Sequence, residues 1–272
     1  MAPTVLITGA SEGIGKASAL LFASKGYDLI LTARHPDNLE SVAQEVQSLG
    51  RPAPLTIPCD VTDSSQVDHL VEKALDHYGY IDILINNAGI FAEGPVEKFS
   101  LSDWHQIIDT NLWGYIHTVH ALLPHFLQRK SGTIVNVSSI GGKVPTPYLV
   151  PYCTSKFGVT GLTESMHAEL KPKGVHVCGI YPNVIKSRFL ERAIFRGQDE
   201  QDTQSRREQL DNVLKNPAVE KPEDVANAIW DAVKNQKSEV FVGSANLSQA
   251  IYRLFPSLLQ WVSRQALKNQ DN

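Results

Sequence analysis

Cysteine is scarce in this chain. Cys59, Cys153 and Cys178 are its three cysteines, and they stand far apart in a sequence of 272 residues. Such spacing gives neither a disulfide framework nor a pair of metal ligands, so it favours a reducing compartment over a secreted one. The first strand-like run begins at once, without the features of a signal peptide. We therefore expect a cytoplasmic protein with no metal site.

Blocks of basic residues and long apolar runs are also missing. The 25 Lys and Arg residues against 29 Asp and Glu residues leave a net charge of −4, so we expect no nucleic-acid partner. No run of about eighteen uncharged apolar residues occurs, which argues against a membrane-spanning helix. A content of 42% hydrophobic and 20% charged residues is typical of a globular protein.

What the chain does have is a regular alternation of short apolar runs with longer amphipathic stretches. The apolar runs fall at residues 5–7, 29–31, 55–57, 83–85, 133–137, 175–180 and 239–242. The helical stretches fall at 13–25, 37–49, 64–78, within 101–129, and at 152–170 and 222–235. Strands that are apolar throughout predict a parallel sheet with helices on both faces. We expect one doubly wound α/β domain (a Rossmann fold) of about seven strands, over residues 1–245.

Two stretches depart from this alternation. Residues 186–217 are polar and rich in charge, which predicts a lid over a substrate site, with a pair of solvated surface helices as the alternative. Residues 246–272 form a C-terminal helical extension with an apolar stripe that favours packing on the domain or on another subunit. A membrane-surface helix is the alternative, which the few cations of this extension disfavour. The stripe consists of Ile251, Leu254, Phe255, Leu258, Leu259 and Val262.

A glycine-rich turn follows the first strand. Gly9, Gly13 and Gly15 lie in the segment Thr-Gly-Ala-Ser-Glu-Gly-Ile-Gly that leads into the first helix. Glycines at such a turn let the backbone approach a pyrophosphate, whose charge the helix N-terminus balances. The same composition is common in ordinary turns, but its position directly after the first strand predicts a dinucleotide site.

The end of the second strand bears on which dinucleotide binds. An NAD site usually has an Asp or Glu there, whereas this chain has Arg34. A guanidinium at that position can pair with a 2′-phosphate. The sequence therefore predicts NADP(H) rather than NAD(H), with the reservation that Glu12 would oppose a nearby phosphate unless it points to water.

Tyr152 and Lys156 stand one helical turn apart, thirteen and seventeen positions after Ser139. One turn places the phenol and the ammonium on the same helix face. A neighbouring ammonium, together with a positively charged oxidised nicotinamide, favours the phenolate and brings the pKa of a tyrosine nearer to the working pH. Taken singly, Ser139 could cap a turn and Tyr152 could pack at the surface. Taken together, after a dinucleotide site, they predict hydride transfer to or from a carbonyl carbon.

These motifs resemble the short-chain dehydrogenase/reductase superfamily in its common single-domain form, from Thr4 to about Gly243. The resemblance implies a homodimer or homotetramer and a small carbonyl or alcohol substrate. It implies Asn111, Ser139, Tyr152 and Lys156 as catalytic residues, with Lys156 also bonding the nicotinamide ribose. Its cofactor-binding residues would be Gly9, Ser11, Gly13, Ile14, Gly15, Arg34, Asp60, Val61, Asn87, Ala88, Gly89, Tyr152, Lys156, Pro182 and Val184.

The chain departs from the family pattern at three positions and at its end. Asn183 and Ser187 replace the usual Gly and Thr, and Glu12 stands where NADP-dependent members often have a basic residue. The Asp-Gly-Gly ending of acyl-carrier ketoreductases is missing, which counts against a role in fatty-acid synthesis.

Substrate identity is not fixed by the sequence. Phe91, Tyr148 and Phe189 predict an apolar substrate pocket, as most ligand pockets are. Two other functions stay open: a catalytically inactive NADP(H)-sensing protein, and a membrane-peripheral reductase of lipid carbonyls.

Overall fold

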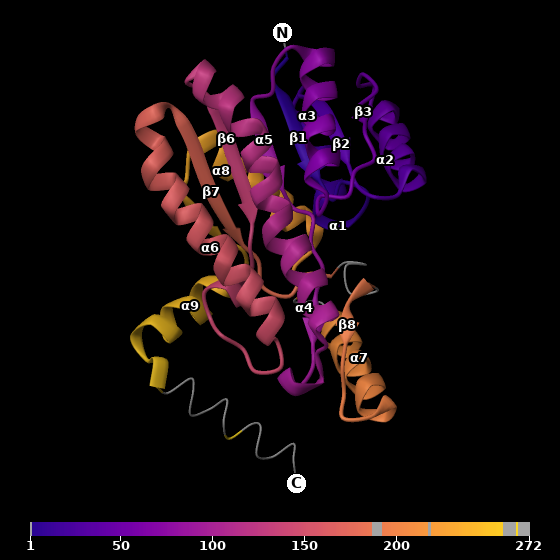
Figure 1. Cartoon of the computed structure of the whole chain (residues 1–272), viewed down its shortest axis with the longest axis vertical. Coiled ribbons are helices and arrows are strands. Elements are labelled where there is room, and N and C mark those ends of the chain that lie inside the picture. The colour runs from indigo at the N-terminus through magenta and orange to yellow at the C-terminus, as the bar shows by residue number, and fades with distance from the viewer. Residues whose placement is uncertain (1, 187–191, 217–218, 258–264, 266–272) are drawn as a thin grey trace.

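Seven parallel strands form the central sheet of the computed structural model, in the order β3-β2-β1-β4-β6-β7-β9 (Figure 1). The structure describes residues 2–186, 192–216, 219–257 and 265. The strands are β1 (Thr4–Thr8), β2 (Asp28–Thr32), β3 (Leu55–Thr56), β4 (Ile83–Asn86), β6 (Gly132–Val137), β7 (Val175–Tyr181) and β9 (Glu239–Phe241). The predicted doubly wound parallel sheet is confirmed.

Helices cover both faces of this sheet because its strands are apolar on both sides. Val5 and Ile7 of β1 pack in one cluster, and Leu6 between them packs in the other. The first face is covered by α1 (Gly13–Ser24), α2 (Pro36–Ser48) and α8 (Pro222–Asn235). The second is covered by α3 (Ser64–Tyr78), α5 (Gly114–Arg129) and α6 (Val150–Leu170). The sheet is therefore packed between two separate hydrophobic cores, which hold the ends of its strands in place.

A second, two-stranded sheet joins the charge-rich insertion to the loop after β4. The strands β5 (Ala92–Glu93) and β8 (Ile194–Phe195) pair in parallel. Arg196 then donates from Nε to a carboxylate oxygen of Asp103 at 3.1 Å, which ties the insertion to α4 (Leu101–Ile108). The helix α7 (Glu200–Leu214) follows, and Figure 1 shows β8 and α7 at the opposite end of the molecule from the N-terminus.

The C-terminal helix α9 (Ala245–Leu254) is anchored at its start and exposed beyond it. Ala245 is fully buried, whereas Leu254 and Phe255 are 71% and 58% exposed. The predicted stripe is thus uncovered at Ile251, Leu254 and Phe255, while Leu258, Leu259 and Val262 lie outside the described residues. Over the described part of the chain, no helix combines the length and apolarity needed to cross a membrane.

Candidate active site

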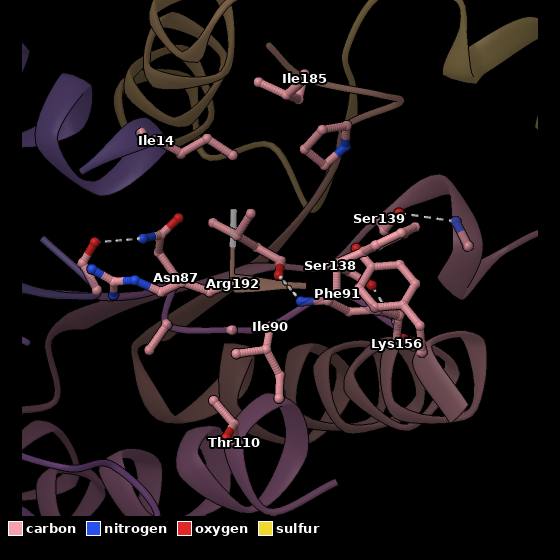
Figure 2. A pocket seen from close by; sticks show the side chains of 18 of the residues that line it. Ile14, Asn87, Ile90, Phe91, Thr110, Ser138, Ser139, Lys156, Ile185 and Arg192 are labelled. Carbon is pink, nitrogen blue, oxygen red and sulfur yellow. Dashed lines mark hydrogen bonds between the residues drawn. The ribbon is translucent and has the colours of Figure 1, made fainter. Parts of the chain in front are cut away.

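A cavity of about 480 Å³ opens at the carboxyl ends of the central strands, beside the point where the strand order turns from β1 to β4. Ligands of doubly wound sheets bind in this place because the chain diverges in opposite directions on either side of it. Figure 2 shows Ile14 and Asn87 toward one end of the cavity and Phe91, Ser139 and Lys156 toward the other. Of the predicted residues, its walls contain Gly9, Ser11, Gly13, Ile14, Arg34, Asp60, Val61, Asn87, Ala88, Gly89, Phe91, Ser139, Tyr148, Tyr152, Lys156, Pro182 and Val184.

The glycine turn has a conformation that side chains would disrupt. Gly9 adopts a φ of 62°, in the left-handed region that favours glycine. A Cβ on Gly15 would lie 2.1 Å from the carbonyl oxygen of Gly9, so Gly15 allows the helix to pack against the turn rather than lining the cavity. Asn87 holds the same turn, since its Nδ2 donates to the carbonyls of Thr8 and Gly9 at 3.0 and 3.2 Å.

The N-terminus of α1 faces the cavity without a side-chain cap. Glu12 occupies the N-cap position, but its carboxylate accepts no hydrogen bond from the first turn. Its Oε1 instead lies 3.4 Å from Nη1 of Arg192, a residue of the insertion. The first backbone N–H groups of α1 thus remain available to an anion, and the charge of Glu12 is balanced. The open helix end and the close-packed glycines fit a pyrophosphate.

The opposite wall of this end carries Arg34, Asp60 and Val61. Arg34 follows β2 and is exposed at the cavity. Asp60 accepts hydrogen bonds at Oδ1 from the backbone N and the hydroxyl of Thr62, at 3.0 and 2.9 Å. These bonds fix the turn after β3. The guanidinium of Arg34 and this ordered turn at Asp60 both line the cavity.

The other end holds Ser139, Tyr152 and Lys156. Tyr152 and Lys156 lie one turn apart on α6, and both side chains are buried. Nζ of Lys156 donates to the carbonyl of Val137 at 3.0 Å and lies 5.9 Å from the centre of the Tyr152 ring. Ser139 lies two residues after the end of β6 in an extended conformation, and its Oγ accepts from the backbone N of Gly141 at 3.1 Å. The end of one strand and the first turns of one helix thereby bring a hydroxyl, a phenol and an ammonium together.

Burial decides the protonation of these groups. Burial raises the pKa of Tyr152 to about 12, and a hydrogen bond with Ser139 opposes part of this rise. Burial also lowers the pKa of Lys156 to about 7. The sequence predicts that the ammonium, together with an oxidised nicotinamide, brings the pKa of Tyr152 toward neutrality. Desolvation acts in the opposite direction and is the largest cause of the shift in the structure.

Asn111 lies behind the cavity rather than in its wall. It belongs to a π-helical turn (Asp109–Trp113) between α4 and α5, and it is fully buried. Its Oδ1 accepts from the backbone N of Ile90 at 2.7 Å, and its Nδ2 donates to the carbonyl of Ile90 at 2.9 Å and to Oγ of Ser155 at 3.0 Å. Asn111 thus joins the cavity wall after β4 to the helix α6.

The loop after β7 lines the cavity next to Ser139. The carbonyl of Pro182 accepts from the backbone N of Ile140, at 2.8 Å, which fixes this loop against the Ser139 turn. Asn183, where the family usually has Gly, donates from Nδ2 to Oγ of Ser244 at 2.7 Å. The side chain of Asn183 therefore connects the loop after β7 to the start of α9. Ser187 and Phe189 lie outside the described residues.

The cavity wall also contains residues that were not among the predicted site residues, and Glu93, Arg192 and Leu210 are three of them. Arg192 and Leu210 fall in the insertion predicted to cover a substrate, but its polar sequence gives no sign of which side chains turn inward. Glu93 lies in the two-residue strand β5, which is too short for its alternation to be recognised in the sequence.

The fold and the cavity define a dinucleotide-binding oxidoreductase, and the comparisons identify its family. The chain belongs to the short-chain dehydrogenase family, whose model matches residues 3–196. It is 37% identical over 188 residues to the 3-oxoacyl-[acyl-carrier-protein] reductase FabG of Thermotoga maritima, covering 69% of this chain and 76% of that protein.

Solved structures of the same family have the same fold. A short-chain dehydrogenase/reductase from Burkholderia phymatum in complex with NAD superposes with a TM-score of 0.86 and 26% identity, over 95% of both chains. A short-chain dehydrogenase from Sphingobium yanoikuyae in complex with NADPH gives a TM-score of 0.77 at 27% identity, again over 95% of both. These two relatives bind different nicotinamide cofactors, so the family alone does not choose between them.

Proposed function

We propose that this protein is an NADP(H)-dependent reductase of a ketone or aldehyde, or the dehydrogenase of the corresponding alcohol. The observation that carries the proposal is the grouping of Ser139, Tyr152 and Lys156 at one end of a cavity whose other end suits a pyrophosphate. An inactive cofactor-sensing protein would have no need of this group. The buried insertion residues around Phe195 support the idea that residues 186–217 cover the substrate.

Each residue of the group has a part in the reaction. The cavity would hold a reduced nicotinamide, which when bound would supply the hydride for the carbonyl carbon. The phenol of Tyr152 gives its proton to the carbonyl oxygen as negative charge develops there, which its raised pKa allows at neutral pH. Ser139 is a fixed hydroxyl that can hydrogen-bond the same oxygen. Lys156 holds the helix against β6 through Val137 and lies close to the Tyr152 ring.

Consumption of NADPH tests the proposal. Purified protein is incubated with NADPH and a panel of ketones, aldehydes, quinones, steroids and acyl thioesters, and absorbance at the nicotinamide band is followed. We expect turnover with at least one carbonyl compound. Binding of NADPH without turnover of any class would favour the inactive sensing protein.

Arg34 is the basis for proposing NADP(H). It lies exposed at the cavity wall, and the adjoining recess at the glycine turn adds the polar side chains of Ser11, Asn38 and Ser41. A guanidinium pairs with a 2′-phosphate through charge-assisted hydrogen bonds. The ion pair of Glu12 with Arg192 supports the same choice, because it removes the carboxylate charge that would repel a phosphate.

We predict that Arg34→Asp lowers the KM for NAD and raises that for NADP, changing the selectivity about 10- to 100-fold, the value of a charged hydrogen bond. Steady-state kinetics with both cofactors measures the change. The control is Arg51→Asp, a charge reversal on an exposed side chain that bonds the carbonyl of Ser24 outside the cavity. Unchanged selectivity in Arg34→Asp would defeat the assignment.

A second candidate, a reductase of lipid carbonyls at a membrane surface, has one observation in its favour. The helix α9 leaves Leu247, Leu254 and Phe255 exposed at its end of the molecule. The double variant Leu254→Ser, Phe255→Ser should lose co-sedimentation with anionic phospholipid vesicles if this candidate is right. Wild-type protein that stays in the supernatant would exclude it.

We also propose a homodimer or homotetramer in the cytoplasm. Light scattering after size-exclusion chromatography measures the subunit number. Cys59, Cys153 and Cys178 are free and buried, which suits a reducing compartment.

A further inference from the structure

Among the residues that the structure describes, one carboxylate of the cavity wall has a charge that the proposed reaction does not use. The charged side chains in its wall are Glu12, Arg34, Asp60, Glu93, Lys156 and Arg192. Arg34 and Asp60 lie at the dinucleotide end, Glu12 pairs with Arg192, and Lys156 bonds the carbonyl of Val137. For the charge of Glu93, neither a partner nor a place in cofactor binding has been given so far.

The local backbone directs Glu93 into the substrate end. Side chains of an extended segment alternate, so Phe91 and Glu93 line the cavity whereas Ala92 between them is fully buried behind it. The ring of Phe91 lies 5.0 Å from that of Tyr152, centre to centre. On the other side, the backbone N of Gly94 donates to the carbonyl of Tyr148 at 2.8 Å. Glu93 therefore stands between the proton donor and Tyr148.

The surroundings of Glu93 leave its carboxylate without a direct partner. Its side chain is half-buried, and among the described residues it makes neither a hydrogen bond nor an ion pair. Burial raises its pKa, and the charge of Arg206 opposes this rise. Placing a carboxylate in an apolar wall is unfavourable unless a partner compensates for the lost water.

Arg206 is already held by other groups. Its Nε lies 3.0 Å from a carboxylate oxygen of Asp202, and its guanidinium stacks over the ring of Tyr148 at 4.3 Å. Arg207 stacks over Phe195 but is exposed to water, which screens its charge. Asp202 pairs with Arg206, so the carboxylate of Glu93 lies among aromatic and aliphatic side chains without an ion pair to any residue that the structure describes.

We infer that the substrate of this enzyme is an amino ketone: a carbonyl compound whose ammonium group pairs with Glu93 while its apolar chain lies against Phe91, Tyr148 and Leu210. The inference rests on the proposed carbonyl reduction and names its substrate class. The ammonium is a charged hydrogen-bond donor, which is what an unpartnered carboxylate in an apolar wall requires.

The test uses matched pairs of ketones with NADPH. One member of each pair is an aliphatic amino ketone, with one or two methylene groups between the carbonyl carbon and the ammonium, spacings too short for the amine to close a five- or six-membered imine ring on the carbonyl. The other has a methyl group in place of the ammonium. For the best spacing, we expect kcat/KM to favour the amino ketone by about 10- to 100-fold. In Glu93→Gln this preference should fall at least tenfold, through KM.

Glu97→Gln is the matched control. Glu97 is a neighbouring exposed carboxylate that accepts from Nε2 of Gln198 at 3.1 Å and does not line the cavity. This variant should retain the preference for the amino ketone. Competitive inhibition of neutral-ketone reduction by decylammonium and by decanol gives a second reading, in which the ammonium should bind more tightly to wild type but not to Glu93→Gln.

The outcomes separate the two proposals. Reduction of the neutral ketones, with no preference for any amino ketone and no stronger inhibition by decylammonium, overturns the inference and leaves the proposed function standing. A preference that persists in Glu93→Gln also overturns it. If neither member of any pair is reduced while another carbonyl compound of the panel is, the inference fails and the proposed function stands. If no carbonyl compound of any class is reduced while NADPH binds, both fail.

Discussion

Tyr152→Phe should bind NADPH as the wild type does and lose about 100- to 10,000-fold in the rate of carbonyl reduction, the usual contribution of a positioned proton donor. The variant removes one oxygen atom from a buried side chain and keeps the ring that packs against Phe91 at 5.0 Å. The cavity wall therefore stays intact while the proton source is lost. Single-turnover reduction and NADPH fluorescence titration measure the two quantities separately.

The raised pKa of Tyr152 adds a condition on pH. A phenol whose pKa lies at about 12 is protonated from pH 6 to pH 9, so its protonation should not limit carbonyl reduction in that range. Tyr80→Phe is the control, because its hydroxyl bonds the carbonyl of Ala2 outside the cavity. Reduction at the wild-type rate by Tyr152→Phe would remove this residue from the mechanism.

The fold could be predicted from the sequence because its signals are local. Each strand of the central sheet is a short apolar run, and each covering helix has an apolar face. The turn from Gly9 to Gly15 can also be recognised from a few adjacent residues, because the left-handed φ of Gly9 and the close packing of Gly15 both require glycine. The structure brings this turn together with Tyr152 and Lys156, as their order in the chain suggested.

What the sequence could not provide depends on contacts between distant residues. Glu12 seemed to oppose a phosphate, and its partner Arg192 stands 180 positions later. Glu93 faces the cavity through a pairing of two-residue strands, a signal too short to detect by periodicity. The pKa of Tyr152 moves upward because the whole domain buries it, and no spacing along the chain reports burial.

Lys156→Met should stabilise the fold at neutral pH while lowering the reduction rate by at least 100-fold, a loss of the size seen for positioned catalytic groups. Burial lowers the pKa of Lys156 from 10.5 to about 7, so between these values the unfolded chain binds more protons than the folded one. Stability therefore rises as pH increases from 7 to 10.5, and below pH 7 the full penalty is present. That penalty is on the order of 5 kcal/mol.

Methionine fills the same space without a charge and leaves no buried group unpaired. The carbonyl of Val137, which accepts from Lys156, also accepts from the hydroxyl of Tyr115 at 2.9 Å. We expect the Tm of Lys156→Met at pH 6 to exceed that of the wild type by at least about 5 °C. The two should converge near pH 10.5, where the wild-type lysine is neutral in the folded state and begins to be so in the unfolded one.

Lys143→Met provides a comparison of opposite sign. Lys143 pairs with Glu164 and Glu239, and these carboxylates raise its pKa, although burial acts against them. Its contribution to stability is present below pH 10.5 and is lost only at higher pH, so removing it should lower Tm at neutral pH. Thermal unfolding of both variants between pH 6 and pH 10.5 tests the pair together. A Lys156→Met protein less stable than the wild type at pH 6 would show that the buried ammonium stabilises the fold, and that its place beside Tyr152 carries no cost in stability.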